Sequence, residues 1–123
     1  MKKTRTTSDL DESTRTLSAF ADPVRLRLLN LLSGEQEEIC VCHLYGALEL
    51  PQPTVSRHLA YLRKHGMVVG RKEGLWVHYR LARPTSGLHR ILFGCLGNCL
   101  GDPEVFAQDR LRLKRLLGCC GAS

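Results

Sequence analysis

The chain has 123 residues, 43% of them hydrophobic, which is enough for one domain with one modest core. Eighteen Lys and Arg against twelve Asp and Glu give a formal net charge of +6, and such a surplus favours a polyanion such as nucleic acid as partner. The sequence has no apolar run long enough to span a bilayer and no apolar signal-peptide core in residues 1–10, so we expect a cytoplasmic chain with no membrane partner. It also has no glycine-rich phosphate loop and no Ser or Cys nucleophile paired by motif with a His and an acid, so we expect neither an enzyme nor an organic cofactor.

Two helices are predicted in the first part of the chain, after an irregular polar arm over residues 1–8. The first helix covers residues 10–21 and carries few apolar side chains, namely Leu10, Leu17 and Phe20. Asp22-Pro23 is typical of a helix start, with Asp as the N-cap and Pro in the first turn. The second helix then runs to Ser33-Gly34, and its apolar stripe at helical spacing comprises Val24, Leu28, Leu31 and Leu32.

Two further helices are predicted on either side of the connector Leu50-Pro51-Gln52-Pro53. The first is short, is preceded by residues 39–44 and ends at Leu48. Both prolines fix φ and push the residue before them out of the helical region, so we expect the connector to be rigid. The second helix covers residues 54–65, ends before Gly66 and buries a stripe formed by Val55, Leu59 and Leu62.

After Gly66 the hydrophobic period changes from helical to two. Residues 68–72 predict one strand, Glu73-Gly74 predicts a turn, and residues 75–81 alternate as a half-exposed strand does. These segments predict a β-hairpin with a basic tip at Arg71-Lys72.

The C-terminal part is predicted to be helical again. Residues 83–87 break the chain, a helix covers 88–98, and Asp102-Pro103 starts a last helix that ends near Leu117, before Cys119-Cys120. We therefore divide the chain into an arm (residues 1–8), a DNA-binding and dimerisation domain (9–100) and a C-terminal helix with a cysteine-containing tail (101–123).

The order of these elements predicts a mainly α fold with a β-hairpin wing, a winged helix-turn-helix, whose partner is double-stranded DNA. The helix over residues 54–65 is the one expected to enter the major groove, where Arg reads guanine and Gln reads adenine. With its apolar stripe buried, the other side chains point largely outward. The predicted DNA-contacting residues are Gln52, Thr54, Ser56, Arg57, His58, Tyr61, Lys64, Arg71 and Lys72, of which the last three are placed for phosphates.

All six cysteines fall into close pairs: Cys40 and Cys42, Cys95 and Cys99, Cys119 and Cys120. In a reducing cytosol such pairs suit metal ligands or redox-active thiols better than structural disulfides, although Cys is also a common small core residue. Cys40 and Cys42 open a helix, where the dipole favours the thiolate. A one-residue gap points two side chains apart in a regular helix or strand, so we expect the sulfurs to converge at a distorted helix start that ligand binding unwinds further.

The segment from Pro51 to Arg63, PQPTVSRHLAYLR, resembles the recognition-helix signature of the ArsR/SmtB family of metal-responsive repressors. Three more segments resemble the family in order and spacing: residues 21–26, the thiol box at 38–44 and the wing at 70–81. The resemblance covers roughly residues 18 to 82. The chain departs from the family pattern at Pro51, where members carry Ser, and at Tyr45, where arsenic sensors carry a third Cys.

The resemblance implies a homodimeric transcriptional repressor that leaves its operator when arsenite or antimonite binds to Cys40 and Cys42. Dimerisation is expected through the helices at residues 10–21 and 88–98. Two alternatives keep the fold, a cadmium- or lead-responsive repressor and a thiol-redox sensor. A third, of another class, is a thiol-rich metal carrier that does not bind DNA.

The third ligand is left open. Cys119 or Cys120 is the leading choice, from the same subunit or its partner, and a two-coordinate site is the alternative. Cys95 and Cys99 are interpreted as packing in a dimer interface in preference to a second site. Zinc is not expected, because the helix after the wing offers His89 without a matching carboxylate or second His.

Overall fold

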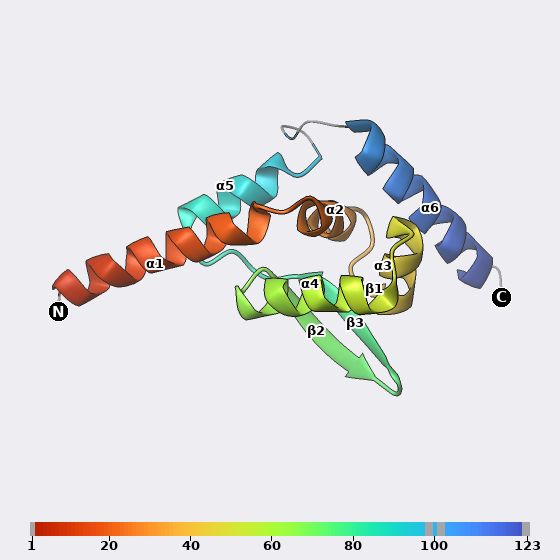
Figure 1. The fold of residues 1–123 in the computed structure, drawn as a ribbon, viewed down its shortest axis with the longest axis horizontal. Helices are drawn as coiled ribbons and strands as arrows, with labels where there is room; N and C mark the ends of the chain where they lie inside the picture. The colour runs from red at the N-terminus through yellow and green to blue at the C-terminus, as the bar shows by residue number, and fades with distance from the viewer. Residues whose placement is uncertain (1, 98–99, 101–102, 122–123) are drawn as a thin grey trace.

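A computed structural model describes the backbone of residues 2–97, 100 and 103–121, and the side chains of 9–97, 100 and 104–118. The elements in chain order are α1 (Lys2–Phe20), α2 (Pro23–Leu32), β1 (Ile39–Cys40), α3 (Val41–Leu48), α4 (Gln52–Lys64), β2 (Val68–Glu73), β3 (Trp76–Leu81), α5 (Gly87–Cys95) and α6 (Pro103–Gly121). Helices α2, α3 and α4 form the centre, the β2–β3 hairpin projects from it, α1 and α5 lie together at one end, and α6 lies at the other (Figure 1). The fold is the predicted mainly α winged helix-turn-helix.

The core lies between α2, α3, α4 and the sheet. The predicted stripe of α4 is fully buried, with Val55, Leu59 and Leu62 each at 0% exposure. It packs against buried leucines of α2 and α3, among them Leu28 and Leu44. Burying one such side chain stabilises the fold by roughly 1.5–3 kcal/mol, so this cluster holds α4 on its two neighbours.

Helix α2 begins and ends where the sequence predicted. The Asp22 side chain accepts hydrogen bonds from the backbone N–H groups of Val24 (2.9 Å) and Arg25 (3.1 Å), which makes it the N-cap. Pro23 is in the first turn, and Ser33 is the C-cap. The cap satisfies N–H groups that have no partner inside the helix.

Four helix boundaries differ from the predictions by two residues or more. Helix α1 begins at Lys2, so residues 2–8 are helical where we expected an irregular arm, and α6 continues past Leu117 to Gly121. Helix α5 ends at Cys95 rather than at residue 98, just before Gly97 at φ 84°. Helix α4 begins at Gln52, two residues early, because a proline in the first helical turn lacks only an N–H that has no helical partner there.

The sheet has three strands in the order β1-β3-β2, one more than predicted. In the hairpin Val68 pairs with Leu81 and Glu73 pairs with Trp76, so the turn is Gly74-Leu75 rather than Glu73-Gly74. Gly74 has φ 61°, which a glycine adopts without strain. The added strand, β1, has only two residues, pairing Ile39 with Tyr79 and Cys40 with His78. Such a short strand carries no periodicity that the sequence could reveal.

Helix α6 packs along α3 and α2 (Figure 1). Its buried side chains include Phe106, Asp109 and Leu113. Among the residues that the structure describes, no helix is both long enough and apolar enough to cross a membrane.

Candidate functional site

The outer surface of α4 carries polar and basic side chains beside the wing. Gln52, Arg57 and Lys64 are exposed, and Thr54 and Ser56 are half-buried. The Gln52 side-chain amide donates a hydrogen bond to the Ser56 hydroxyl, which orders both groups at the first turns of the helix. This end of a recognition helix is the part that reaches base edges in the major groove.

His58 and Tyr61 do not point outward as predicted. The Arg25 guanidinium of α2 lies 3.9 Å from the centroid of the Tyr61 ring, and that ring stacks on His65 at 4.0 Å. His58 Nδ1 lies 3.7 Å from Asp22 Oδ2, and burial lowers the pKa of His58. Both side chains therefore join α4 to the start of α2.

Arg25 connects α2 to both α1 and α4, and this role was not predicted from the sequence. Its guanidinium also donates to the backbone oxygens of Ser18 (2.8 Å) and Ala19 (3.0 Å) at the end of α1. In the sequence Arg25 lies two residues after Pro23 and off the apolar stripe of α2. A solvent-exposed arginine would show the same pattern, so the sequence alone does not indicate this role. The aromatic partner comes from a helix 36 positions away, and only the fold shows it.

The two predicted basic residues of the wing differ in their surroundings. Lys72 is exposed. Arg71 is engaged by two carboxylates, because its Nη2 lies 2.8 Å from Glu38 Oε1 and 3.0 Å from Glu73 Oε1. The hydrogen bond to Arg71 lowers the pKa of Glu38, so the carboxylate stays ionised beside the guanidinium.

Cys40 and Cys42 lie where β1 ends and α3 begins. Cys40 is the N-cap of α3, with an extended backbone (φ −65°, ψ 143°), and Cys42 is in the first turn. The Cys42 thiol donates to Cys40 Sγ at 3.1 Å, so the sulfurs converge. The change from strand to helix between the two residues brings the sulfurs together at the helix start, as predicted. Cys40 is 8% exposed and Cys42 is half-buried.

Among the side chains that the structure describes, no group of three or more His, Cys, Asp or Glu is arranged to hold a metal ion. Cys99 and the side chains of Cys119 and Cys120 lie outside the described residues. Cys95 is half-buried at the end of α5.

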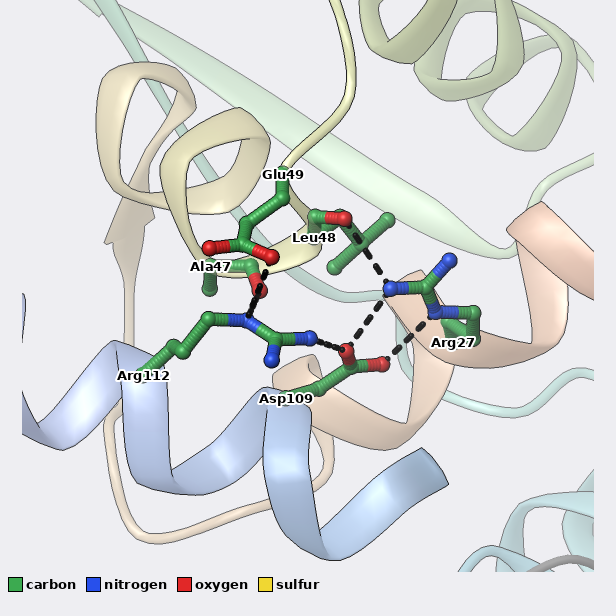
Figure 2. A network of polar contacts seen from close by, with 6 residues as sticks. All are labelled: Arg27, Ala47, Leu48, Glu49, Asp109 and Arg112. Carbon is green, nitrogen blue, oxygen red and sulfur yellow. Dashed lines mark hydrogen bonds and ion pairs between the residues drawn. The ribbon is translucent and has the colours of Figure 1, made fainter.

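Asp109 of α6 forms a buried polar network that the sequence analysis missed. Its carboxylate accepts hydrogen bonds from Arg27 Nε and Nη2, both at 2.8 Å, and from Arg112 Nη2 at 2.7 Å (Figure 2). The sequence contains a signal for this network, because Asp109 lies at helical spacing between Phe106 and Leu113 on the apolar face of α6. A carboxylate buried on such a face needs a partner.

The fold and the α4 surface define a class of protein, the winged helix-turn-helix DNA-binding proteins. The family profile described as bacterial regulatory protein, arsR family, matches residues 22–69. The arsenic resistance transcriptional regulator ArsR1 of Pseudomonas putida is 52% identical over 98 residues, which cover 79% of this chain and 73% of that protein. The arsenical resistance operon repressor of Escherichia coli is 55% identical over 63 residues, which cover 51% of this chain and only 53% of that protein.

Among solved structures, the homodimeric winged helix-turn-helix DNA-binding domain Mb0332 of Mycobacterium bovis is 31% identical with a TM-score of 0.63, over 87% of this chain and 88% of that one. The chain belongs to the ArsR family of DNA-binding transcriptional repressors, which are regulators and not enzymes. The resemblance stated from the recognition-helix and wing residues is thereby confirmed.

Proposed function

We propose that this repressor is released from its operator when a trivalent metalloid, arsenite or antimonite, binds Cys40 and Cys42. The observation that carries the proposal is the 3.1 Å separation of the two sulfurs. Thiolates are the soft ligands that proteins offer to thiophilic ions, and two of them at this separation chelate one ion without a rearrangement of α3. The Pseudomonas putida and Escherichia coli relatives are named for arsenic resistance, which supports the same inducer.

The surroundings of the pair suit an anionic ligand set. The N-terminus of α3 presents backbone N–H groups and the positive end of the helix dipole, both of which stabilise thiolates. A cytoplasmic location would keep the thiols reduced and able to bind.

We place the third donor at Cys119 or Cys120, supplied by α6 of the same subunit. Helix α6 runs antiparallel to α3: Arg112 Nε donates to Ala47 O at 2.6 Å, and a Cβ built on Gly46 would lie 2.9 Å from Leu116. One further turn of α6 leads toward the N-terminal half of α3, where Cys42 lies four residues before Gly46. This register favours the subunit's own α6 over that of a partner.

For operator binding we propose that Gln52, Thr54, Ser56 and Arg57 approach base edges and that Lys64 and Lys72 contact phosphates. His58 and Tyr61 act by holding α4 on α2. Arg71 contacts a phosphate after it leaves its two carboxylate partners, Glu38 and Glu73.

We propose a homodimer formed through α1 and α5. These helices lie side by side and together expose Leu10 (67%), Leu17 (52%) and Ile91 (65%). The Mycobacterium bovis domain of the same fold is described as homodimeric. A two-fold dimer presents two α4 helices to two half-sites of a pseudo-palindromic operator.

Release follows from the position of the thiols between the DNA-binding elements. Cys40 belongs to β1, which pairs with β3 of the wing, and Cys42 belongs to α3, which packs against α4. When a third donor on α6 joins the two sulfurs on one ion, the pull on this junction shifts the wing relative to the recognition helix. Tenfold weaker operator binding requires only about 1.4 kcal/mol of coupling, and DNA then weakens metalloid binding by the same factor.

The test is an arsenite titration of the reduced protein bound to labelled operator. Cys40→Ser and Cys42→Ser should abolish release, the double change of Cys119 and Cys120 to Ser should weaken it, and Cys95→Ser is the matched control that should behave as the wild type. Release that persists in both Cys40→Ser and Cys42→Ser, or arsenite that binds the complex tightly without releasing DNA, would contradict the proposal.

Three parallel arms separate the alternatives. Release by peroxide but not by arsenite would favour the redox sensor, and release at lower Cd²⁺ or Pb²⁺ concentrations than arsenite would favour the divalent-ion sensor. A reduced wild type without salt-sensitive DNA binding would favour the carrier.

A further inference from the structure

The turn between α3 and α4 is held from outside the helix-turn-helix. The last residues of α3 have backbone carbonyls without partners inside the helix. Arg27 Nη2 donates to Leu48 O at 3.0 Å, and Arg112 Nε donates to Ala47 O at 2.6 Å (Figure 2). These two guanidinium groups come from α2 and α6, and they approach α3 at the end from which the chain enters α4.

The backbone at this turn is strained, and the arginines lie beside the strained residue. Glu49 adopts φ 55° and ψ 44°, a left-handed conformation that costs a residue with a side chain free energy. Its carboxylate lies 3.9 Å from Arg112 Nε. Two residues later Pro51 is the N-cap of α4. The direction in which α4 begins therefore depends on a few backbone angles that the arginines help to maintain.

Asp109 fixes both arginines at once. It is 0% exposed, and it accepts a bidentate pair of hydrogen bonds from Arg27 together with one from Arg112. The hydrogen bond to Asp109 raises the pKa of Arg27. A buried carboxylate is tolerated only when it is paired and hydrogen-bonded in this way, so the three side chains have one favourable arrangement.

We infer that Asp109 is a positioning residue for operator recognition: through Arg27 and Arg112 it sets the α3–α4 turn and hence where the first turn of α4 meets the DNA. This makes α6, which lies outside the family-matched residues 22–69, a determinant of operator affinity. Because Asp109 is buried in α6 and its hydrogen bonds to Arg27 and Arg112 connect it to the turn, its effect on DNA is indirect. The inference concerns DNA binding alone and holds whatever the inducer is.

The test compares Arg112→Gln with Arg115→Gln. Both remove one positive charge from α6, but Arg115 is exposed and Arg112 contacts Ala47 and Asp109. Affinity is measured for the operator and for a scrambled duplex, without inducer, at a temperature where circular dichroism shows each variant to be folded. We expect Arg112→Gln to weaken operator binding about tenfold, equivalent to about 1.4 kcal/mol, and to leave scrambled-duplex binding equal to that of Arg115→Gln.

Two further measurements separate positioning from general destabilisation. Partial unfolding lowers operator and scrambled-duplex binding together, whereas a misplaced α4 lowers only the former. Amide hydrogen exchange should accelerate in Arg112→Gln at Glu49 and Leu50, whose N–H groups bond to Gly46 O and Tyr45 O, and not in the β2–β3 hairpin. Arg112→Lys should recover part of the operator affinity, because it keeps the charge but not the planar fork.

If Asp109→Asn remains folded, it should show the same loss of operator affinity. If it does not fold, the comparison of Arg112→Gln with Arg115→Gln tests the inference. The inference is overturned if folded Arg112→Gln binds the operator as tightly as Arg115→Gln, or if operator and scrambled-duplex affinity fall by the same factor.

Discussion

Arg71 of the wing and Glu38 form a bidentate ion pair in which the guanidinium Nε lies 3.0 and 3.1 Å from the two carboxylate oxygens. Glu38 directly precedes β1, and the pair reaches across the sheet from one edge strand to the other. Arg71 lies opposite His78 in register, and His78 lies opposite Cys40. The proposed sensor thiol and a proposed phosphate contact thus lie in one row across the sheet.

Removing the carboxylate should strengthen DNA binding. In Glu38→Gln the Arg71 side chain loses its bidentate partner and keeps the contact with Glu73, so it gives up fewer charged contacts in order to meet a phosphate. We therefore expect higher operator affinity and a salt dependence steeper by up to about one ion. Glu37→Gln, at the exposed neighbouring position, removes the same charge and is the control. Fluorescence anisotropy across a salt series measures both effects, and an equal gain in the two variants would show that only net charge matters.

The buried His89 should make the fold sensitive to acid. Its Nδ1 accepts the Thr85 N–H at 3.2 Å, and burial lowers its pKa. In the unfolded chain the histidines have a pKa of about 6.5. Below that pH the unfolded state binds a proton that the folded state does not, so the free energy of unfolding falls as the pH drops from about 7 toward the lowered pKa.

Urea unfolding between pH 7 and 5 measures this slope. We expect His89→Gln, which keeps a hydrogen-bond acceptor, to reduce the dependence of the free energy of unfolding on pH. Part of the dependence should remain, because burial also lowers the pKa of His58. His78→Gln on β3 serves as the control. Parallel pH profiles for wild type and His89→Gln would contradict the prediction.

Gly46 and Gly94 offer a matched test of the α3–α6 contact. Both lie inside helices, where Ala is more favourable than Gly by about 1 kcal/mol. A Cβ at Gly94 meets no atom within 4 Å in the described part of the chain, whereas one at Gly46 lies 2.9 Å from Leu116 Cδ1. We expect Gly94→Ala to raise the free energy of unfolding by about 1 kcal/mol and Gly46→Ala to raise it less or to lower it. Denaturant titration measures the free energy of unfolding of both variants. Equal gains would mean that α6 makes room for the added methyl group at no cost in free energy.

The proposed dimer surface should fail when a charge is placed in its centre. Ile91→Glu puts a carboxylate on an α5 position that is 65% exposed in the single subunit, and burying it against a partner would be costly. Sedimentation should show monomers, and operator affinity should fall because two half-sites are no longer bound together. Leu75→Glu at the hairpin turn, 93% exposed, should remain dimeric. If Ile91→Glu remains dimeric, the dimer interface does not include this face of α5.

Much of the fold could be predicted because it depends on local patterns. The stripe of Val55, Leu59 and Leu62, the Asp22 cap and the β-hairpin each depend on a few neighbouring residues, and the structure confirms them. Helix lengths were predicted less well, since α1 begins well before residue 10 and α6 continues through Gly118, which was expected to end it, to Gly121.

The site divides in the same way. The sequence alone determined that two thiols stand one residue apart at a helix start and that a polar, basic helix follows two prolines, since residue types and spacing are properties of the chain. The tertiary structure decided that the β1–α3 junction brings the sulfurs to 3.1 Å and that Tyr61 and His58 face α2. It also decided that Asp109 forms hydrogen bonds with Arg27, 82 positions away in the sequence. Those contacts join segments with no local relationship, so only the packing of the whole chain selects them.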